Sequence, residues 1–241
     1  MTLTEIVARA KPKLGRLAFT GPVACVYNPL TYAWDLHRQY LERFGEGRKQ
    51  VVMLGMNPGP FGMVQTGVPF GEVDAVKGWM GLRGAVRKPK VEHAKRPILG
   101  LESTRSEVSG RRLWGWAAQR FGTPERFAAR FFVYNYCPLA FLSETGANLT
   151  PDKLKRAEAA PLFAICDRVL RQVVAALEPA WLVGVGAFAE ARIRRLFAAE
   201  IDEAGLRVGR IPHPSPASPA ANRGWERLAD QAFLDLGIDL G

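Results

Sequence analysis

The chain has 241 residues, of which 48% are hydrophobic and 10% aromatic, so it can bury a sizeable core and is expected to fold as one domain over residues 1–241. No apolar run approaches the roughly 18 residues of a membrane span, and residues 1–5 lack the pattern of a secretory signal, so an intracellular protein with no membrane partner is expected. The net charge of +10 makes a polyanion the natural partner, although charge alone does not identify one.

Apolar periodicity predicts strands that alternate with helices along the chain. Such alternation favours parallel strand pairing by right-handed crossovers, with helices on both faces of the sheet. The expected fold class is therefore α/β, a three-layer α/β/α sandwich with a central four-stranded parallel sheet. The predicted strands span residues 50–54, 130–135, 181–185 and 206–211, and the predicted helices span residues 4–14, 31–44, 74–80, 111–121, 150–177, 187–199 and 220–236.

The segment after the first predicted strand is unusually rich in glycine and proline. Residues 55–70 contain four glycines and three prolines, which fix an irregular backbone because proline restricts φ and glycine permits close approach. A loop at the C-terminal end of a strand is where an α/β protein usually keeps its site. A structural loop packed under its own side chains is the alternative.

Polar residues follow three of the four predicted strands. Asn57 follows the first strand, Asn135 ends the second, and His213 begins a proline-rich segment after the fourth. Each residue alone could be a cap or a structural contact. Because the carboxyl ends of parallel strands converge on one crevice, we expect the three to lie close together.

Several reaction types lose support from the motifs that the chain lacks. There is no paired-carboxylate arrangement, no phosphate-binding Gly-rich loop ending in Lys-Ser or Lys-Thr, and no Gly-x-Ser-x-Gly elbow. The three scattered cysteines, Cys25, Cys137 and Cys166, have neither the number for a disulfide framework nor the spacing for a zinc site. The candidate groups that remain are carboxamides, an aromatic ring and a histidine. Such a set is suited to binding a flat, uncharged heterocycle and to stabilising an anion as it leaves.

Three long motifs stand out: residues 55–72 (GMNPGPFGMVQTGVPFGE), residues 135–139 (NYCPL) and residues 213–225 (HPSPASPAANRGW). They resemble the single-strand-selective monofunctional uracil-DNA glycosylase family, which belongs to the uracil-DNA glycosylase superfamily. The resemblance covers roughly residues 20 to 230, and its fold, a parallel four-stranded sheet between helices, agrees with the predicted one. Further matches are Gly21-Pro22-Val23, residues 27–30, residues 98–102 and Glu107-Val108-Ser109-Gly110.

The resemblance implies a monofunctional enzyme that flips uracil out of DNA and hydrolyses its N-glycosidic bond, without metal or cofactor. It implies that Asn57 holds the attacking water and that His213 stabilises the departing base. Phe70 would stack on the base, and Asn135 would read its pairing edge. No lysine lies in the three motifs, so a Schiff-base nucleophile for strand cleavage is missing and the abasic strand should stay intact.

The loop of residues 55–70 would line the rest of the base pocket. Gly59 and Met63 would lie near C5 of the base, where a glycine leaves space for 5-hydroxymethyluracil and other C5-oxidised pyrimidines. Thymine should still be rejected. The other expected pocket residues are Gly55, Met56 and Phe61.

The resemblance also implies a DNA-binding loop after His213. This loop enters the double helix, and the arginine often seen there is Ala217 in this chain, so activity on single strands should be favoured relative to duplex. The basic segment of residues 83–96 is either a phosphate contact or a solvated surface. The expected DNA-binding residues are Pro214, Ser215, Pro216, Ala217, Ser218, Arg223 and Gly224, and the expected partner is uracil-containing DNA, single- or double-stranded, bound by a monomer.

Three other functions stay open at this point. A member of the same superfamily could prefer hypoxanthine or xanthine if the pocket were wider. A damage-binding module could keep the pocket without turnover, although the presence of both Asn57 and His213 speaks against it. An α/β protein unrelated to repair could bind free nucleotides instead.

Overall fold

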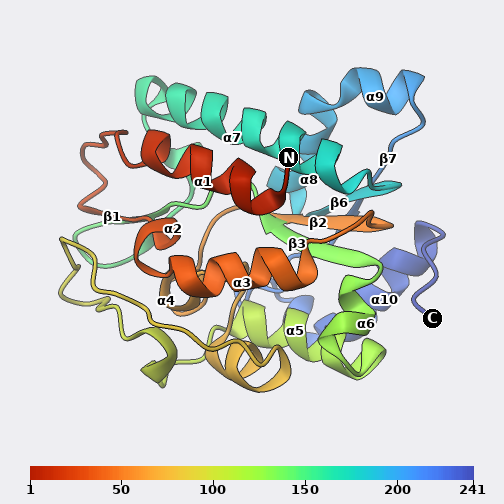
Figure 1. Ribbon diagram of the computed structural model, residues 1–241, viewed down its shortest axis with the longest axis horizontal. Coiled ribbons are helices and arrows are strands. Elements are labelled where there is room, and N and C mark those ends of the chain that lie inside the picture. Colours follow the sequence, from red (N-terminus) through yellow and green to blue (C-terminus); the bar gives the residue numbers. More distant parts are fainter.

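Four parallel strands form the centre of the computed structural model, which describes all of residues 1–241 (Figure 1). Every residue of the first three is buried, which explains why the sequence shows continuous apolar runs rather than alternation. The predicted parallel sheet is confirmed, with each strand within one residue of its expected position. The strands, in spatial order, are β3 (Phe131–Asn135), β2 (Val51–Gly55), β6 (Trp181–Val185) and β7 (Arg207–Ile211).

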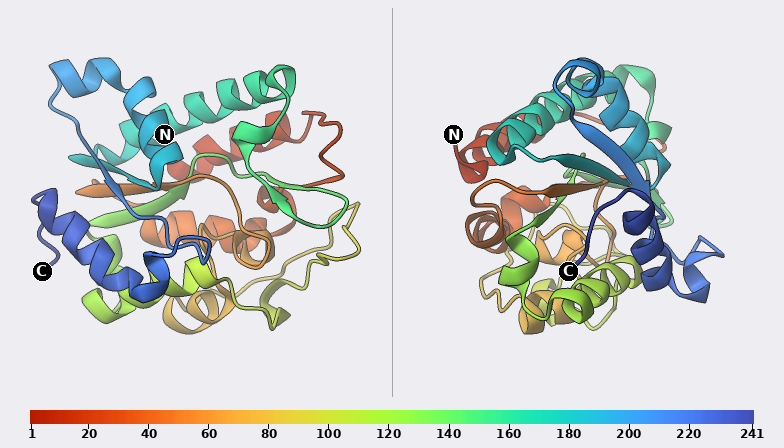
Figure 2. Two further views of the ribbon diagram at one scale, coloured as in Figure 1. Left: turned by 180° about the vertical axis from the view of Figure 1, so that it is seen from behind. Right: turned by 90° about the vertical axis from the view of Figure 1, so that its right-hand side faces the viewer.

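Helices cover both faces of this sheet (Figures 1 and 2). On one side lie α1 (Leu3–Leu14), α7 (Arg156–Leu177), α8 (Ala187–Leu196) and α9 (Ala198–Glu203). On the other lie α3 (Trp34–Phe44), α5 (Val108–Phe121), α6 (Pro124–Ala128) and α10 (Trp225–Asp235). The remaining helical segments are single turns: α2 (Pro29–Tyr32), α4 (Met63–Thr66), a π-turn over Ala75–Trp79, and 3₁₀ turns over Gly100–Glu102, Pro151–Lys153 and Ala221–Arg223.

Four predicted helices are interrupted. The helix expected over residues 31–44 is divided at Ala33 into α2 and α3, and the helix expected over residues 187–199 is divided at Phe197 into α8 and α9. The helix expected over residues 150–177 begins as a 3₁₀ turn, and extended backbone at Leu154 separates this turn from α7. The helix expected over residues 220–236 is broken at Gly224, whose φ of 117° lies outside the helical region. In all four places local backbone geometry interrupts a pattern that is continuous in the sequence.

A second, antiparallel sheet was missed by the sequence reasoning. It consists of β1 (Cys25–Tyr27), β4 (Ala140–Leu142) and β5 (Asn148–Leu149), in the order β1-β4-β5. Strands of two or three residues are too short to show a periodicity. This sheet brings the segment after β5 toward the C-terminal end of the central sheet, where it contributes to the cavity described below.

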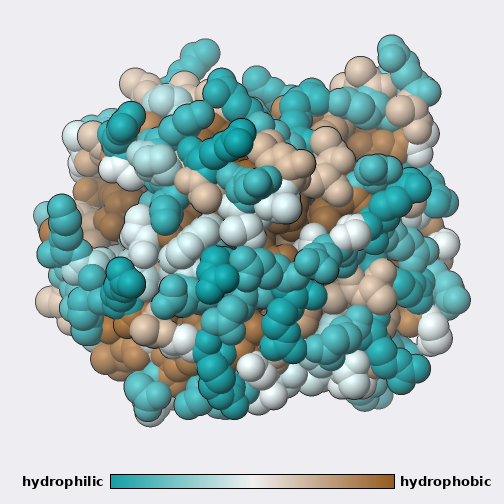
Figure 3. Space-filling model, viewed as in Figure 1, coloured by the Kyte–Doolittle hydropathy of each residue, from teal (hydrophilic) through white to brown (hydrophobic).

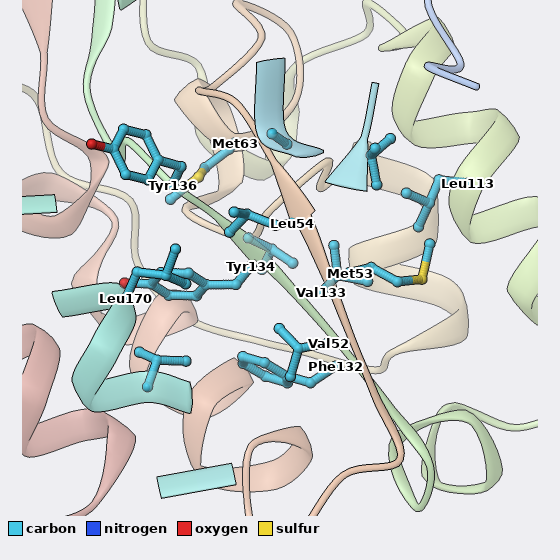
Figure 4. Packing of buried hydrophobic residues seen from close by; sticks show 14 of the residues in the cluster. Val52, Met53, Leu54, Met63, Leu113, Phe132, Val133, Tyr134, Tyr136 and Leu170 are labelled. Carbon is cyan, nitrogen blue, oxygen red and sulfur yellow. The ribbon is translucent and has the colours of Figure 1, made fainter. Parts of the chain in front are cut away.

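The sheet and both helical layers share one hydrophobic cluster of 56 buried residues. Parallel pairing sets Met53 beside Val133 and Leu54 beside Tyr134. Figure 4 shows the first pair on the side of Leu113, which lies in α5, and the second on the opposite side of the sheet. The strand ends that carry the polar residues are therefore anchored in the core on both faces.

The face of the molecule shown in Figure 3 is largely hydrophilic. Figure 3 shows hydrophilic side chains spread over most of one face, with hydrophobic ones recessed between them. The large hydrophobic side chains that are exposed are Met1, Val91, Leu99 and Leu234. None of the helices combines the length and the apolar character needed to cross a membrane.

Candidate active site

A cavity of about 320 Å³ opens at the C-terminal ends of β2, β3 and β7. It brings together Asn57, Asn135 and His213, which the sequence placed after three different strands. The structure thus gathers the three residues around one space, as the parallel topology led us to expect. The complete lining is Met56, Asn57, Gly59, Pro60, Met63, Phe70, Glu107, Ser109, Asn135, Asn148, Thr150, His213, Ser215 and Pro216.

Strand register places Gly55 against Asn135. The two residues are partners in the parallel β2–β3 ladder, and a Cβ atom on Gly55 would overlap Asn135 Oδ1 and lie 2.5 Å from Cε2 of Phe70. Gly55 does not line the cavity itself. Its missing side chain lets the amide of Asn135 and the ring of Phe70 approach each other.

Phe70 is held in a backbone conformation that side chains rarely adopt. Its φ is +53°, and the carbonyl of the preceding Pro69 accepts a 3.2 Å hydrogen bond from Nε1 of Trp114. Gly110 of α5 passes so close that a Cβ there would overlap the Phe70 carbonyl oxygen. The half-buried ring lies with its centroid 5.9 Å from that of His213, at 45°. An aromatic face is thereby presented to the cavity.

Asn135 has one amide atom without a partner. The residue is only 4% exposed; its Nδ2 donates to the sulfur of Met63 at 3.3 Å, while its buried Oδ1 makes no hydrogen bond. A buried polar atom left unpaired costs free energy, so an unpaired acceptor on a residue that lines the cavity indicates a ligand donor. The contact with Met63 also indicates which end of the amide is the donor.

His213 presents a hydrogen-bond donor to the cavity. The backbone N–H of Ser215 donates to Nδ1 at 3.1 Å, so Nδ1 is an acceptor and the proton of the neutral ring is on Nε2. Burial lowers the pKa of His213 below its usual value of 6.5, which favours this neutral form at pH 7.

Asn57 also carries an unsatisfied amide. Its Nδ2 is buried without a hydrogen-bond partner, and no hydrogen bond holds its side chain. The neighbouring Pro58 is fixed from the other side, because its carbonyl oxygen accepts a 3.4 Å hydrogen bond from Asn148. The Asn57 amide is free to bind a small polar molecule.

Glu107 is a cavity residue that sequence reasoning did not assign. It precedes α5, and its Oε2 accepts a 3.3 Å hydrogen bond from the backbone N–H of Phe61. A Cβ on Gly59 would lie 2.9 Å from the carboxyl carbon of Glu107. The space expected beside Gly59 is therefore occupied by a carboxyl group rather than open.

The predicted DNA-binding segment lies only partly at the cavity. Ser215 and Pro216 line it, while Pro214, Ala217, Ser218, Arg223 and Gly224 do not. The loop is fastened to α5 by Arg112, which donates to the Pro214 carbonyl at 2.9 Å and to Asn222 Oδ1 at 2.8 Å. Sequence reasoning missed Arg112, because nothing local marks a helix-surface arginine as a partner of a loop about a hundred residues away.

Phe61 and the basic segment lie beside the cavity rather than in it. The Phe61 side chain does not line the cavity, and the guanidinium groups of Arg96 and Arg105 lie 5.2 Å each from its ring centroid. Arg83 donates to the carbonyl of Leu82 at 2.9 Å, and Lys88 pairs with Glu92 at 3.1 Å. Part of the segment's charge is thus engaged within the protein.

Comparison with known proteins agrees with the resemblance that the motifs suggest. The model of the uracil DNA glycosylase superfamily matches residues 42–236. Two similar proteins are named single-strand selective monofunctional uracil DNA glycosylase. The one from Bos taurus is 49% identical to this chain over 95% of this chain and 84% of its own length. The one from Rattus norvegicus is 48% identical over 95% of this chain and 82% of its own length. The crystal structure of wild-type SMUG2 from Pedobacter heparinus shares the fold, with a TM-score of 0.68 at 18% identity over 99% of this chain and 100% of that one. With a family model across most of its length and relatives near half identity, this chain belongs to the uracil DNA glycosylase superfamily.

Proposed function

We propose that this protein is a monofunctional uracil-DNA glycosylase of base-excision repair. The observation that carries the proposal is the unpaired Oδ1 of Asn135, whose Nδ2 already contacts Met63. Uracil offers an N3–H donor to such an acceptor, with O4 beside it for the amide NH₂. Cytosine has a lone pair at N3 and an amino group at C4, which is the opposite pattern, so this amide orientation selects uracil.

Phe70 provides the face on which the flipped base stacks. Base–aromatic stacking is worth about 1 to 3 kcal/mol and is sequence-tolerant, so the stacking supplies affinity while Asn135 supplies selectivity. Because Gly55 allows the two groups to meet, the pocket depends on its missing side chain.

Gly55→Ala should therefore lower kcat/KM for uracil by about 100-fold, because displacing a positioning group by about 1 Å can cost that much. Gly115→Ala is the matched control: its Cβ meets nothing within 4 Å, and it should keep activity while stabilising helix α5 by about 1 kcal/mol. Initial rates on a uracil oligonucleotide and thermal unfolding measure both. Equal activity of Gly55→Ala and wild type would contradict the proposed pocket.

His213 acts on the leaving group. As the glycosidic bond breaks, negative charge collects on the base, and the Nε2–H of a neutral His213 donates a hydrogen bond to O2. Asn57 holds a water molecule beside the sugar. When the glycosidic bond breaks, the sugar becomes an oxocarbenium ion, which a neutral water molecule can attack. An amide is a weak base, so the rate depends on leaving-group stabilisation more than on proton removal.

The strand is left uncut. Strand cleavage by a glycosylase needs an amine nucleophile, and no lysine is among the residues that line the cavity. The product we expect is an intact abasic strand.

The loop after His213 fills the gap in a duplex. Ala217 is exposed and small, so the loop is a weak wedge, and release from single-stranded DNA should exceed release from a matched duplex. Initial rates on the two substrates measure this, and a clear preference for duplex would contradict it. Ala217→Arg should raise the duplex rate more than the single-strand rate, because a larger plug holds the helix open.

The function is tested with oligonucleotides that each carry one lesion. Uracil should be released, with breaks appearing only after alkali. Breaks without alkali would contradict the monofunctional assignment. Release of hypoxanthine or xanthine in preference to uracil would reassign the native base, and unchanged uracil after long incubation would indicate a binding module.

A further inference from the structure

Glu107 forms part of the cavity wall, and its carboxyl group is held in place by the loop after β2. It packs against two glycines of the loop after β2: a Cβ on Gly59 would lie 2.9 Å from its carboxyl carbon, and a Cβ on Gly62 would lie 2.9 Å from its Cγ. The N–H of Phe61, between those glycines, donates to Oε2 at 3.3 Å. Burial raises the pKa of Glu107, and the nearby backbone N–H groups of Phe61 and Ser109 oppose this rise.

The position of Glu107 relative to a bound base follows from the proposed function, on which this inference rests. With O2 at His213 and the N3–C4 edge at Asn135, C5 lies beyond O4, on the side of the Asn135 Nδ2. Met63, whose sulfur accepts from that Nδ2, is on this side. Gly62, which directly precedes Met63, packs on the Cγ of Glu107, and both Met63 and Glu107 line the cavity, so we infer that the carboxyl group lies at the C5 end of the pocket.

We propose that Glu107 determines which C5 substituents the enzyme accepts, by accepting a hydrogen bond from a hydroxyl group carried on C5. One carboxylate has about four acceptor positions, and the loop N–H groups leave some of them for a ligand. A hydroxymethyl group at C5 donates to this carboxylate. A methyl group has no donor and would exclude water from a charged group without replacing its hydrogen bonds, which costs free energy.

The proposal ranks substituents by their chemistry rather than by their size. A 5-formyl group offers only acceptors and gains nothing from the carboxylate. A 5-carboxyl group is similar in size to a hydroxymethyl group but is anionic, so it is repelled. A pocket that merely had room would not distinguish the three by hydrogen-bonding character or by charge.

The isosteric variant Glu107→Gln should reverse this ranking. The N–H of Phe61 requires an oxygen, so the amide side chain that this substitution introduces would direct its NH₂ group toward the base. The atom facing C5 then changes from an acceptor to a donor without a change in volume. We expect the ratio of kcat/KM for 5-hydroxymethyluracil to that for uracil to fall about tenfold, and the corresponding ratio for 5-carboxyuracil to rise about tenfold.

The test measures kcat/KM on oligonucleotides that each carry one lesion: uracil, 5-hydroxymethyluracil or 5-carboxyuracil. The proteins compared are wild type, Glu107→Gln, Glu107→Ala and the control Glu102→Gln. Glu102 is exposed and outside the cavity, so its variant should match wild type on all three. Glu107→Ala, which removes both charge and acceptor, should also lower the hydroxymethyl ratio and raise the carboxyl ratio, so the proposal remains testable if one variant is unstable.

Opposite shifts on the two substituted bases support the proposal. An equal loss on all three bases would overturn it, because Glu107 would then only position the loop of residues 59–62. If wild type releases uracil but the two ratios do not change in either variant, only the assignment of Glu107 fails. If wild type releases no uracil, the proposed function fails, and this inference fails with it.

Discussion

Replacing His213 with alanine should lower kcat for uracil release by about 10² to 10³, because losing one donor aimed at a developing oxyanion typically costs that much. KM should change little, since the hydrogen bond strengthens only as charge reaches the base. Single-turnover rates on a uracil oligonucleotide measure the effect. The protein should remain folded, because the His213 ring is half-buried and its hydrogen bond to Ser215 is within its own loop.

The pH profile distinguishes the neutral imidazole from a charged one. Because burial lowers the pKa of His213 below 6.5, the ring is neutral at pH 7, and kcat should not depend on pH above this pKa. As pH falls through the lowered pKa, protonation places a hydrogen on Nδ1, which then opposes the N–H of Ser215, and kcat should fall. The His213→Ala variant should lose this acid limb. A rate that rises on acidification would show that the imidazolium is the catalyst.

Asn57→Ala should lower kcat by about 100-fold, the second large effect that we expect. The variant removes the group that we propose to position the attacking water, and loss of positioning alone can cost this much. Removing an amide whose Nδ2 has no partner should leave the free energy of unfolding nearly unchanged. Chemical denaturation provides that control.

Asn57→Asp separates positioning from proton removal. Its carboxylate can hold the same water and can also act as a base, which typically contributes about 10² to 10⁴ in rate. This variant should at least match wild type near neutral pH and lose activity in acid, where the carboxyl group is protonated. If Asn57→Ala and wild type were equally active, the water would be held elsewhere.

The central sheet was predictable because its strands carry their own signal. β2, β3 and β6 are fully buried runs of β-branched, aromatic and other apolar residues, and burial on both faces makes such runs continuous. The antiparallel sheet has no such signal, since β5 contains two residues and depends on β4 for its pairing. Long elements are specified locally, whereas short ones are specified by their neighbours.

The residues of the site also fall into those that could be predicted from the sequence and those that could not. Asn57, Asn135 and His213 could be placed together because parallel strands converge at their carboxyl ends, which is a property of the topology. Glu107, Asn148 and Thr150 reach the cavity from segments whose positions depend on side-chain contacts and on the small sheet. For Glu107 a signal was present, since the residues 107–110 match the family, but a motif match alone did not say what the carboxylate faces.

Helix α5 supports both the cavity and the loop after His213. The residue before it supplies the Glu107 carboxylate, Gly110 abuts the backbone of Phe70, and Arg112 fastens the loop after His213. These contacts fall within two turns of one helix, so a displacement of α5 would move both the Phe70 ring and the loop after His213. A substitution on the buried side of α5, outside the cavity, should therefore alter the proposed base stacking and the proposed contact with duplex DNA together.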